Sequence, residues 1–266
     1  ISLLEKSDTG TITFNGEDLS DLNKEKIKNF RQSLQLILQD PYNSLPSRQT
    51  IGRIISEGLL IHSQYNKSEI KEKVLSTMRE VGINQDEYNK LLVGKSGSFR
   101  QRVSIARALI LEPKVIILDE TLSSLDQNEQ EMLLSLFRQI QAKRNLTYIF
   151  ISHDLAMVRK SCNRIAVMYM GRTVELAENK ILFNKCGHPY TRTLLCTIPT
   201  LDKNPYDKKL YLMDGEPPDP TEIGRGCSFN SRCPNPTKEC KEGSVEMGLI
   251  EVESGHWVDK CCVNCS

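Results

Sequence analysis

The stretch VIILDE, residues 115–120, constrains the fold of this chain more than any other segment. Its run of apolar residues is typical of a strand buried on both faces of a parallel sheet. Asp119 and Glu120 follow at the end of that strand, and α/β proteins bind their ligands at the carboxyl edge of such a sheet. Carboxylates at this edge can hold Mg²⁺ or polarise an attacking water. The alternative interpretation is that these acids only cap a following helix.

Strands and helices alternate along most of the chain, which predicts an α/β fold with a largely parallel sheet. Further strands are predicted over residues 11–15, 34–38, 148–151, 165–170 and 173–176, with hairpin turns at Asn15-Gly16 and Gly171-Arg172. Residues 148–151, YIFI, are apolar throughout and are expected in a central strand buried on both faces. Helical periodicity covers residues 70–81, 100–111 and 127–142. A helical subdomain is expected at about residues 51–111.

Polar side chains also follow the strands on either side of VIILDE in the sequence. Gln39 comes directly after residues 34–38, and His153 comes shortly after residues 148–151. Because the ends of parallel strands meet at one edge of a sheet, we expect His153 to lie near Glu120. Gln39 at a strand end can reach Mg²⁺ or a water, or it can simply belong to a turn before Pro41.

Charge and cysteine distribution bound the classes of function. Lys and Arg number 35 and Asp and Glu number 34, so the net charge of +1 gives no electrostatic reason to expect a nucleic-acid partner. Most of the 9 cysteines fall near the end of the chain, at Cys227, Cys233, Cys240, Cys261, Cys262 and Cys265. A long cysteine-poor body before such a cluster favours an intracellular protein with a metal-type appendage over a secreted disulfide domain. Prolines at 205, 217, 218 and 220 predict a linker between the cysteine-poor body and the cysteine cluster.

In the order and spacing of its motifs, the chain resembles the nucleotide-binding subunits of ABC transporters over nearly its whole length. Residues 115–120 resemble the Walker B strand, Gln39 the Q-loop, and His153 the H-loop switch. The stretch SSLD, which ends at Asp126, resembles the D-loop, and RQRVSIARAL at 100–109 resembles the helix after the signature sequence. QDPYNSL at 39–45 and HPYTRTLL at 188–195 are similar to the oligopeptide, dipeptide and nickel importer branch.

This resemblance implies a P-loop NTPase-like fold that uses ATP and Mg²⁺ to power the import of oligopeptides, dipeptides or nickel. Glu120 would activate water, His153 would contact the γ-phosphate, and Asp119 with Gln39 would serve Mg²⁺. The implied partners are a second ABC ATPase subunit, two membrane permease subunits and, indirectly, an extracytoplasmic substrate-binding protein. The implied location is peripheral, on the cytoplasmic face of the cell membrane. The expected division is a partial nucleotide-binding domain at 1–199, a linker at 200–226 and a cysteine-rich tail at 227–266.

Two departures from the family pattern bear on activity. No GxxxxGK[ST] phosphate loop occurs in the sequence, so the resemblance implies that several tens of amino-terminal residues are absent. The family signature LSGGQ aligns with KSGSF at 95–99, which keeps Ser96 and Gly97 but places Ser98 where a glycine is usual. We expect the Ser98 side chain to crowd the approach of a phosphate.

In the family, each ATP lies between the phosphate loop of one subunit and the signature of the other. The missing loop therefore affects one ATP site of the pair, and the altered signature affects the other. A degenerate, non-hydrolysing subunit that pairs with an active ATPase is therefore the alternative function. On either interpretation, we expect the chain alone to hydrolyse ATP poorly or not at all.

The cysteine-rich tail resembles that of peptide-importer ATPases, in CSFNSRCP at 227–234 and GHWV at 255–258. Some members of that branch hold a [4Fe–4S] cluster on four such cysteines. The resemblance implies the ligands Cys227, Cys233, Cys240 and Cys261, with Cys262 as the competitor for the fourth position. A Cys₄ zinc site is the direct alternative, and disulfides are the third.

Overall fold

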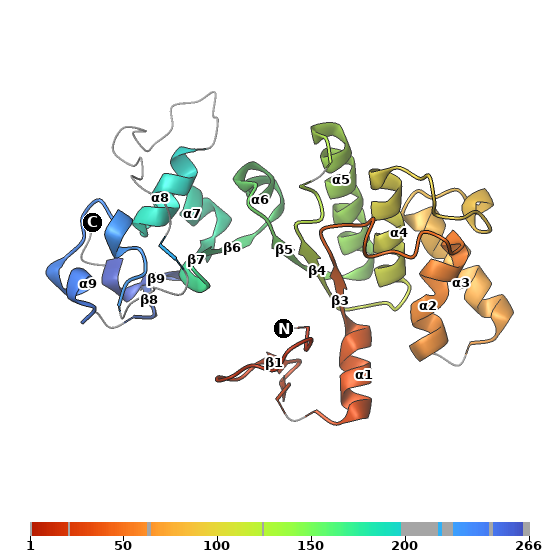
Figure 1. Ribbon diagram of the computed structural model, residues 1–266, viewed down its shortest axis with the longest axis horizontal. Helices are drawn as coiled ribbons and strands as arrows, with labels where there is room; N and C mark the ends of the chain where they lie inside the picture. Colours follow the sequence, from red (N-terminus) through yellow and green to blue (C-terminus); the bar gives the residue numbers. More distant parts are fainter. Residues whose placement is uncertain are drawn as a thin grey trace. The chain divides into compact units, whose positions relative to one another are not determined.

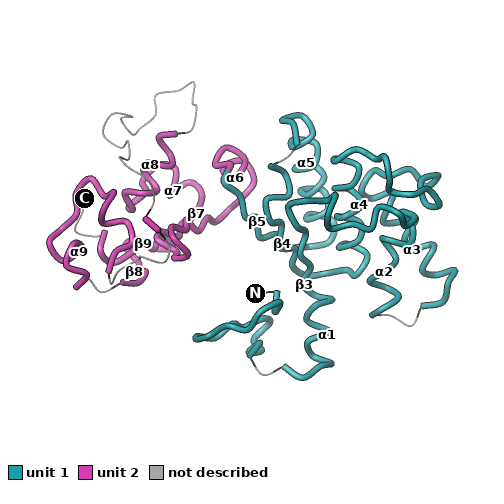
Figure 2. Tube along the Cα trace, in the orientation of Figure 1, with its two compact units in different colours: residues 1–153 teal, residues 154–266 magenta. Residues whose placement is uncertain are grey.

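The computed structural model describes residues 2–20, 22–62, 65–123, 125–197, 218–219, 226–244 and 247–262. The chain divides into two compact units, residues 1–153 and 154–266 (Figure 2). Most of the predicted linker at 200–226 lies outside the described residues, as do Ser124 and Cys265. The predicted domain boundaries at 199 and 227 therefore stay predictions.

The first unit contains a parallel sheet in the order β3-β4-β5 (Figure 1). Its strands are β3 (Leu34–Ile37), β4 (Val115–Asp119) and β5 (Thr147–Ile151). The central strand β4 is buried, with Ile116 and Leu118 0% exposed, as the apolar run predicts. The register aligns Leu118 with Ile37 on one side and with Phe150 on the other, so the three strands end at the same edge.

The prediction that residues 148–151 are buried on both faces is wrong. Successive side chains of a strand point to opposite faces. Tyr148 and Phe150 pack against Phe137, with ring centroids 5.3 and 6.0 Å away. On the other face, Ile149 and Ile151 are 36% and 50% exposed. Among the described strands β5 pairs only with β4, so it is an edge strand of this sheet.

The predicted periodicity is confirmed in α3 (Lys67–Glu80), α4 (Gly97–Leu109) and α5 (Gln127–Arg144). Helix α2 (Ile51–His62) and a short 3-10 turn at η1 (Gln85–Glu87) lie within the range expected for the helical subdomain, whereas α1 (Lys24–Ser33) lies outside the predicted helical ranges. Helices α2, α3 and α4 pack against one another and form the helical part of this unit. Near the start of the chain, β1 (Thr13–Phe14) and β2 (Glu17–Asp18) form the expected hairpin, in which Asn15 and Gly16 both take positive φ.

The second unit is built on an antiparallel sheet in the order β6-β7-β9-β8. Strands β6 (Arg164–Tyr169) and β7 (Arg172–Glu178) form the hairpin predicted around Gly171. The cysteine-rich stretch contributes β8 (Leu249–Glu253) and β9 (His256–Asp259), and β9 pairs with β7. Its helical elements are α6 (Leu155–Ser161), α7 (Asn179–Lys185), α8 (Pro189–Cys196), η3 (Asn230–Arg232), α9 (Lys238–Glu242) and η4 (Lys260–Cys262).

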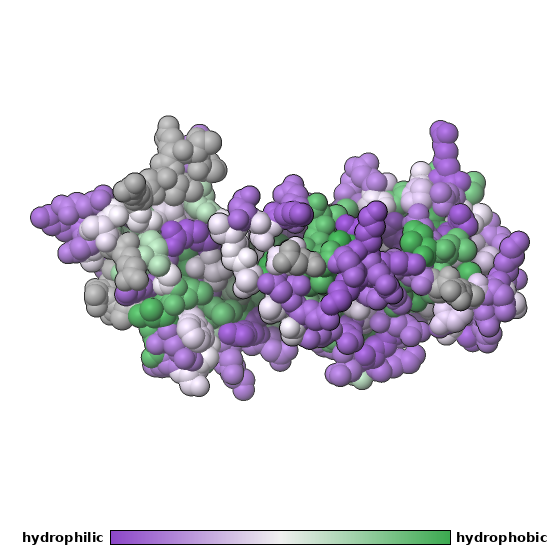
Figure 3. Space-filling model, turned by 90° about the horizontal axis from the view of Figure 1, so that it is seen from below, coloured by the Kyte–Doolittle hydropathy of each residue, from purple (hydrophilic) through white to green (hydrophobic). Residues whose placement is uncertain are grey.

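The expected α/β fold is confirmed, although only the first unit's sheet is parallel in the described residues. Hydrophilic residues predominate on the face drawn in Figure 3, where hydrophobic residues form separate patches. Within the part of the chain that the structure describes, no helix combines the length and the apolar character that a membrane span requires.

Candidate functional site

Glu120 lies at the carboxyl end of β4 in an uncommon backbone conformation. Its φ is +45°, a left-handed value that few residues other than glycine adopt. Its N–H donates to the carbonyl of Ile151 at 2.9 Å, which ties the end of β4 to the end of β5. Non-glycine residues in this region concentrate at functional sites, where the surrounding structure holds them in place.

Two side chains from the neighbouring strand ends contact the Glu120 carboxylate. Gln39 Nε2 donates to Glu120 Oε2 at 2.7 Å, and His153 Nδ1 lies 3.1 Å from Glu120 Oε1. The His153 side chain is 71% exposed and the Glu120 side chain 30%, so the group opens to solvent. We call Gln39, Glu120 and His153 the Glu120 cluster. The predicted proximity of His153 to Glu120 is confirmed, and the contact of Gln39 with Glu120 is an addition from the structure. The chemical roles of all three residues stay predictions.

Asp119 and Asp126 lie outside these contacts. Asp119 is half-buried and is the residue of β4 that pairs with Ile151. Asp126 is the N-cap of α5, where its Oδ1 accepts the Glu129 N–H at 2.9 Å. The turn between them is held by Ser123, whose Oγ donates to the Glu120 carbonyl at 2.8 Å. Asp126 therefore has a structural role as a cap, and its predicted place in an ATP site stays a prediction.

Ser96 and Gly97 begin α4, the helix predicted to follow the signature. Ser96 is the N-cap, and its Oγ accepts the Phe99 N–H at 3.3 Å and lies 3.3 Å from Ser98 Oγ. The ammonium of Lys95 lies 4.9 Å from the centroid of the Phe99 ring and also pairs with Glu87. Lys95 and Phe99, which both depart from the family signature, therefore contact each other, whereas Ser98 contacts the retained Ser96.

Arg100 connects this helix start to the segment after Gln39, and the sequence reasoning did not single it out. It is 5% exposed, and its guanidinium lies 4.6 Å from the centroid of the Tyr42 ring. It donates from Nη2 to the Leu92 carbonyl at 3.1 Å and from Nε to the Lys95 carbonyl at 3.2 Å. The sequence did carry one signal for this role: Arg100 lies on the face of the helix that packs against the core. A charged residue in that position is expected to be buried with partners.

Near Tyr42, the Asp40 side chain orders the segment that leaves β3. Its Oδ1 accepts the Tyr42 N–H at 2.7 Å, and its Oδ2 accepts from Asn43 Nδ2 at 2.6 Å. Arg107 of α4 donates to the Ser44 carbonyl at 3.3 Å. The segment that begins at Gln39 thus contacts both Glu120 and the helix that starts at Gly97.

The predicted cysteine ligands lie in the second unit and are largely buried. Cys227 and Cys240 are 6% and 3% exposed, Cys261 is 7% exposed, and Cys233 is half-buried. A hydrogen bond with Cys261 and burial raise the pKa of Cys227, whereas burial and the nearby charges of Cys227 and Cys240 raise the pKa of Cys233. We call these four thiols the cysteine cluster.

The donor set of this cluster fits a thiolate-bound metal in its chemistry. None of the cysteines in the described ranges forms a disulfide. Cys262 Sγ lies 3.5 Å from Cys261 Sγ, while Cys227 contacts Cys261, which favours Cys261 as the fourth candidate. However, no set of at least three His, Cys, Asp or Glu side chains among the described residues is arranged to hold an ion. The thiols are neighbours that do not converge on one point.

A buried carboxylate on β7 holds the cysteine-rich stretch against the sheet. Glu175 is 0% exposed, and its Oε1 lies 2.8 Å from Nε2 of His256, the first residue of β9. The same carboxylate accepts the Gly187 N–H at 2.7 Å and the His188 N–H at 3.0 Å. Sequence reasoning missed Glu175, because an isolated glutamate in an otherwise alternating strand carries no motif.

Phe229, between Cys227 and Cys233, is a second attachment. It is 1% exposed and packs among three rings, whose centroids lie 5.2 Å (Tyr169), 5.7 Å (Tyr190) and 5.6 Å (His188) from its own. His188 is itself the N-cap of α8, with Nδ1 accepting the Tyr190 N–H at 3.0 Å. Burial and the charge of Arg192 lower the pKa of His188 to about 4, so its ring is neutral at pH 7.

Comparisons with known proteins agree with these observations. The family model described as "ABC transporter" matches residues 1–123, and that described as "Oligopeptide/dipeptide transporter, C-terminal region" matches residues 174–240. The di/tripeptide transport ATP-binding protein DppF of Pseudomonas aeruginosa is 36% identical over 251 residues, which cover 94% of this chain and 77% of the relative. The oligopeptide transport ATP-binding protein AppF of Bacillus subtilis is 39% identical over 257 residues, with 96% and 78% covered.

A solved structure shares the fold. It is that of cbiO1 from Clostridium perfringens, described as part of the ABC transporter complex cbiONQ. The TM-score is 0.62 at 28% sequence identity, and the match covers 69% of this chain and 72% of the other.

Proposed function

The chain belongs to the ABC transporter family, as an ATP-binding protein of the oligopeptide and dipeptide importer type, and from this premise we propose that the Glu120 cluster is the hydrolytic part of its ATP site. The observation that carries the proposal is the Glu120 carboxylate held between Gln39 at 2.7 Å and His153 at 3.1 Å. ATP with Mg²⁺ is the substrate that this family uses, and its hydrolysis powers import.

Each member of the cluster has a task that its position supports. Glu120, at the end of a buried strand, accepts a proton from the attacking water. His153, whose side chain is 71% exposed, reaches the γ-phosphate from the neighbouring strand end. Asp119 and Gln39 supply the oxygen atoms that Mg²⁺ prefers.

These tasks cover only part of an ATP site. Residues 1–266 contain no GxxxxGK[ST] sequence, so the assignment to this chain leaves out the loop that cradles the phosphates. Ser96 and Gly97 face the ATP of a second subunit in the proposed assembly, and Asp126 lies at the same interface. The alternative, a non-hydrolysing subunit, is not favoured, because the relatives are named transport ATP-binding proteins and the Glu120 cluster keeps its mutual contacts.

Cargo and partners follow from the relatives. The names of DppF and AppF specify di/tripeptide and oligopeptide transport, which supports peptides as the cargo class and gives no support to nickel. We propose a second ATPase subunit, two permease subunits and an extracytoplasmic binding protein as the complete importer. This chain would then be attached to the membrane through the permeases, at the cytoplasmic face.

The cysteine cluster supports a second, separate proposal. Cys227, Cys233, Cys240 and Cys261 would hold a [4Fe–4S] cluster or Zn²⁺, because four thiolates suit both and a cation offsets the mutual repulsion of thiolates that lie side by side. Iron, sulfide and zinc analysis of the purified chain separates the candidates. Visible absorption with about stoichiometric iron and sulfide supports the cluster, and a colourless protein with zinc supports the Cys₄ site. A protein with neither, when purified without oxygen, would refute both.

The hydrolytic proposal is tested in the assembled importer, with ATP turnover as the measurement. Glu120→Gln removes the proton acceptor and keeps the shape of the side chain. We expect turnover to fall by at least about 100-fold, the usual contribution of a general base. Glu25→Gln, in the exposed first turn of α1, is the matched control and should leave turnover unchanged. Equal turnover of Glu120→Gln and the unchanged protein would refute the assignment.

A further inference from the structure

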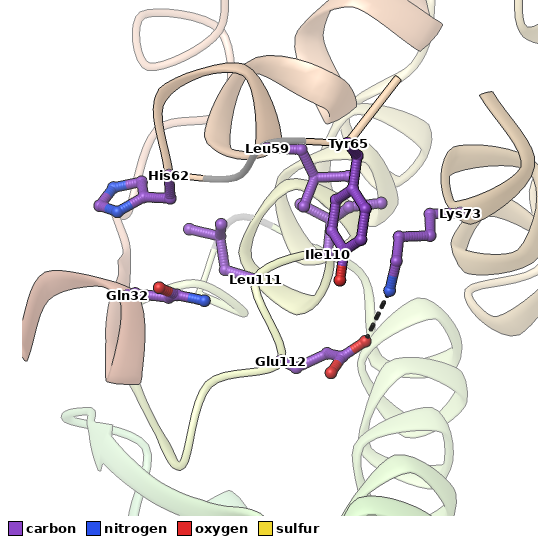
Figure 4. Close-up of a pocket in the computed structure, with 8 residues that line it drawn as sticks. All are labelled: Gln32, Leu59, His62, Tyr65, Lys73, Ile110, Leu111 and Glu112. Atoms are coloured by element: carbon purple, nitrogen blue, oxygen red, sulfur yellow. Dashed lines mark hydrogen bonds and ion pairs between the residues drawn. The ribbon is translucent and has the colours of Figure 1, made fainter. Parts of the chain in front are cut away.

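A cavity of about 260 Å³ lies in the first unit, apart from the Glu120 cluster (Figure 4). Its walls come from the end of α1, the end of α2, Tyr65 before α3, the middle of α3 and the connection from α4 to β4. Leu59, Ile110 and Leu111 form the apolar part, and each is no more than 5% exposed. The remaining lining is polar, which distinguishes this cavity from an ordinary packing defect.

One side of the cavity carries a pair of opposite charges. Lys73 Nζ lies 3.2 Å from Glu112 Oε1, and the two side chains are 34% and 70% exposed. The Lys73 ammonium also lies 4.8 Å from the centroid of the Tyr65 ring. Glu112 has a φ of +54°, a left-handed conformation that is uncommon for glutamate. Figure 4 shows Tyr65, Lys73 and Glu112 together on this side.

The opposite side is polar and uncharged. Gln32 and His62 lie on that side, across the cavity from Lys73 and Glu112 (Figure 4). Burial and the charge of Lys28 lower the pKa of His62, which keeps the imidazole neutral at pH 7. Among the described residues, the buried Nδ1 atom of His62 has no hydrogen-bond partner. Gln32 and His62 therefore give this side of the cavity polar side chains without a net charge.

We propose that this cavity binds a free α-amino acid with an uncharged polar side chain. Adjacent positive and negative groups match the α-carboxylate and α-ammonium groups, which are themselves adjacent: the carboxylate accepts from Lys73, and the ammonium donates to Glu112. The side chain then extends over Leu111 toward Gln32 and His62. A simple anion would meet the Glu112 carboxylate, and a simple cation would meet the Lys73 ammonium, so a ligand with both charges fits best.

The cavity borders the connection between α4 and β4, the two elements that carry the signature-like segment and the end of the strand before Glu120. Ile110, Leu111 and Glu112 connect α4, which begins next to Ser96, to β4, which ends at Asp119. A bound amino acid would therefore touch the connection between the signature-like segment and the strand that leads to Glu120. Within the proposed importer, free amino acids are the class that peptide hydrolysis produces from its cargo, so the site would act as an effector site.

Direct binding of L-glutamine to the full chain, measured by isothermal titration calorimetry, tests the proposal. We expect saturable binding that weakens at least tenfold in Lys73→Met and in Glu112→Gln. N-acetyl-L-glutamine, which lacks the ammonium, and L-glutaminamide, which lacks the carboxylate, should each bind at least tenfold more weakly than L-glutamine. Because binding is measured without ATP, failure here is separate from failure of the hydrolytic assignment.

The matched controls are Lys26→Met and Glu17→Gln, which remove an exposed pair at 3.3 Å in the same unit, away from the cavity. Each should bind L-glutamine within about twofold of the unchanged chain. Circular dichroism identifies a variant that fails to fold, and Glu112→Gln, on an exposed side chain, then provides the comparison. Absence of saturable binding, equal weakening in the controls, or equal affinity for N-acetyl-L-glutamine would overturn the proposal.

Discussion

The Glu120 cluster and the cysteine cluster are organised in different ways. In the first, side chains from three parallel strand ends meet at one carboxylate, at 2.7 and 3.1 Å. In the second, neighbouring thiols and burial raise the pKa of Cys227 and of Cys233, and the thiols do not converge on one point in the described residues. The register of a parallel sheet is sufficient to place polar groups at its edge, whereas a thiol site is completed by the group that it binds.

The largest expected effect on stability concerns the attachment of the cysteine cluster. Phe229→Ala empties the space among three aromatic rings and should cost about 3–5 kcal/mol locally, as large-to-small changes in a core do. Hydrogen exchange at β7 and β9 measures this loss as reduced protection. Protection of β3 and β4 should not change, and Phe229→Leu should cost less. If exchange at β9 were unaltered, the attachment through Phe229 would be wrong.

Acid should weaken the second unit through His188. Its pKa in the folded chain, about 4, lies below the unfolded value of 6.5, so the unfolded chain binds the proton more tightly. The buried neutral ring therefore adds to the free energy of unfolding in full above pH 6.5, and this contribution is lost as the pH falls toward 4. It amounts to about 3 kcal/mol, because each pKa unit corresponds to about 1.36 kcal/mol.

The matched variant for this pH effect is His188→Asn, because asparagine can still cap α8. Hydrogen exchange at α8 should depend less on pH between 6.5 and 4 in this variant than in the unchanged chain. Identical pH profiles for the two chains would show that His188 does not titrate in this range.

Within the Glu120 cluster, His153→Ala removes one of the two contacts to the carboxylate. We expect ATP turnover of the assembled importer to fall about 100-fold, which is about 2.7 kcal/mol in the barrier. Because the His153 side chain is 71% exposed, thermal stability should hardly change. A large loss of stability with unchanged turnover would reverse this assignment and make His153 a structural residue.

The smallest expected effect concerns Asp126. Asp126→Ala removes the cap of α5 and should cost about 1 kcal/mol in stability, measured by urea unfolding. Asp126→Asn should retain most of this stability, since asparagine is an equally good cap. If both variants lost turnover without a loss of stability, Asp126 would belong to the ATP site rather than to the helix end.

Sequence predicted the Glu120 cluster better than the cysteine cluster, for a physical reason. VIILDE specifies a buried strand, and the ends of parallel strands meet, so the proximity of Gln39, Glu120 and His153 follows from local patterns. Contacts that do not lie at the ends of neighbouring parallel strands carry no such pattern. Glu175 and His256 are 81 positions apart, and only the folded chain brings them together.

Two further features escaped the sequence reasoning because they depend on tertiary packing. The apolar run at 148–151 looks like a fully buried strand, yet Ile151 is 50% exposed because β5 is an edge strand in the described sheet. The stacking of Arg100 on Tyr42 joins residues whose separation follows no helical or strand period. In both cases the sequence shows which residue types are present but does not show which residues they pack against in the folded chain.

Glu120 in the proposed ATP site serves the chemical step and not the binding of ATP. ATP affinity and ATP turnover of the assembled importer, measured side by side for Glu120→Gln and the control Glu25→Gln, test it most directly. We expect Glu120→Gln to bind ATP within about threefold of the control while turnover falls at least about 100-fold. Turnover equal to that of the control, or a loss of affinity that accounts for the whole effect, would contradict it.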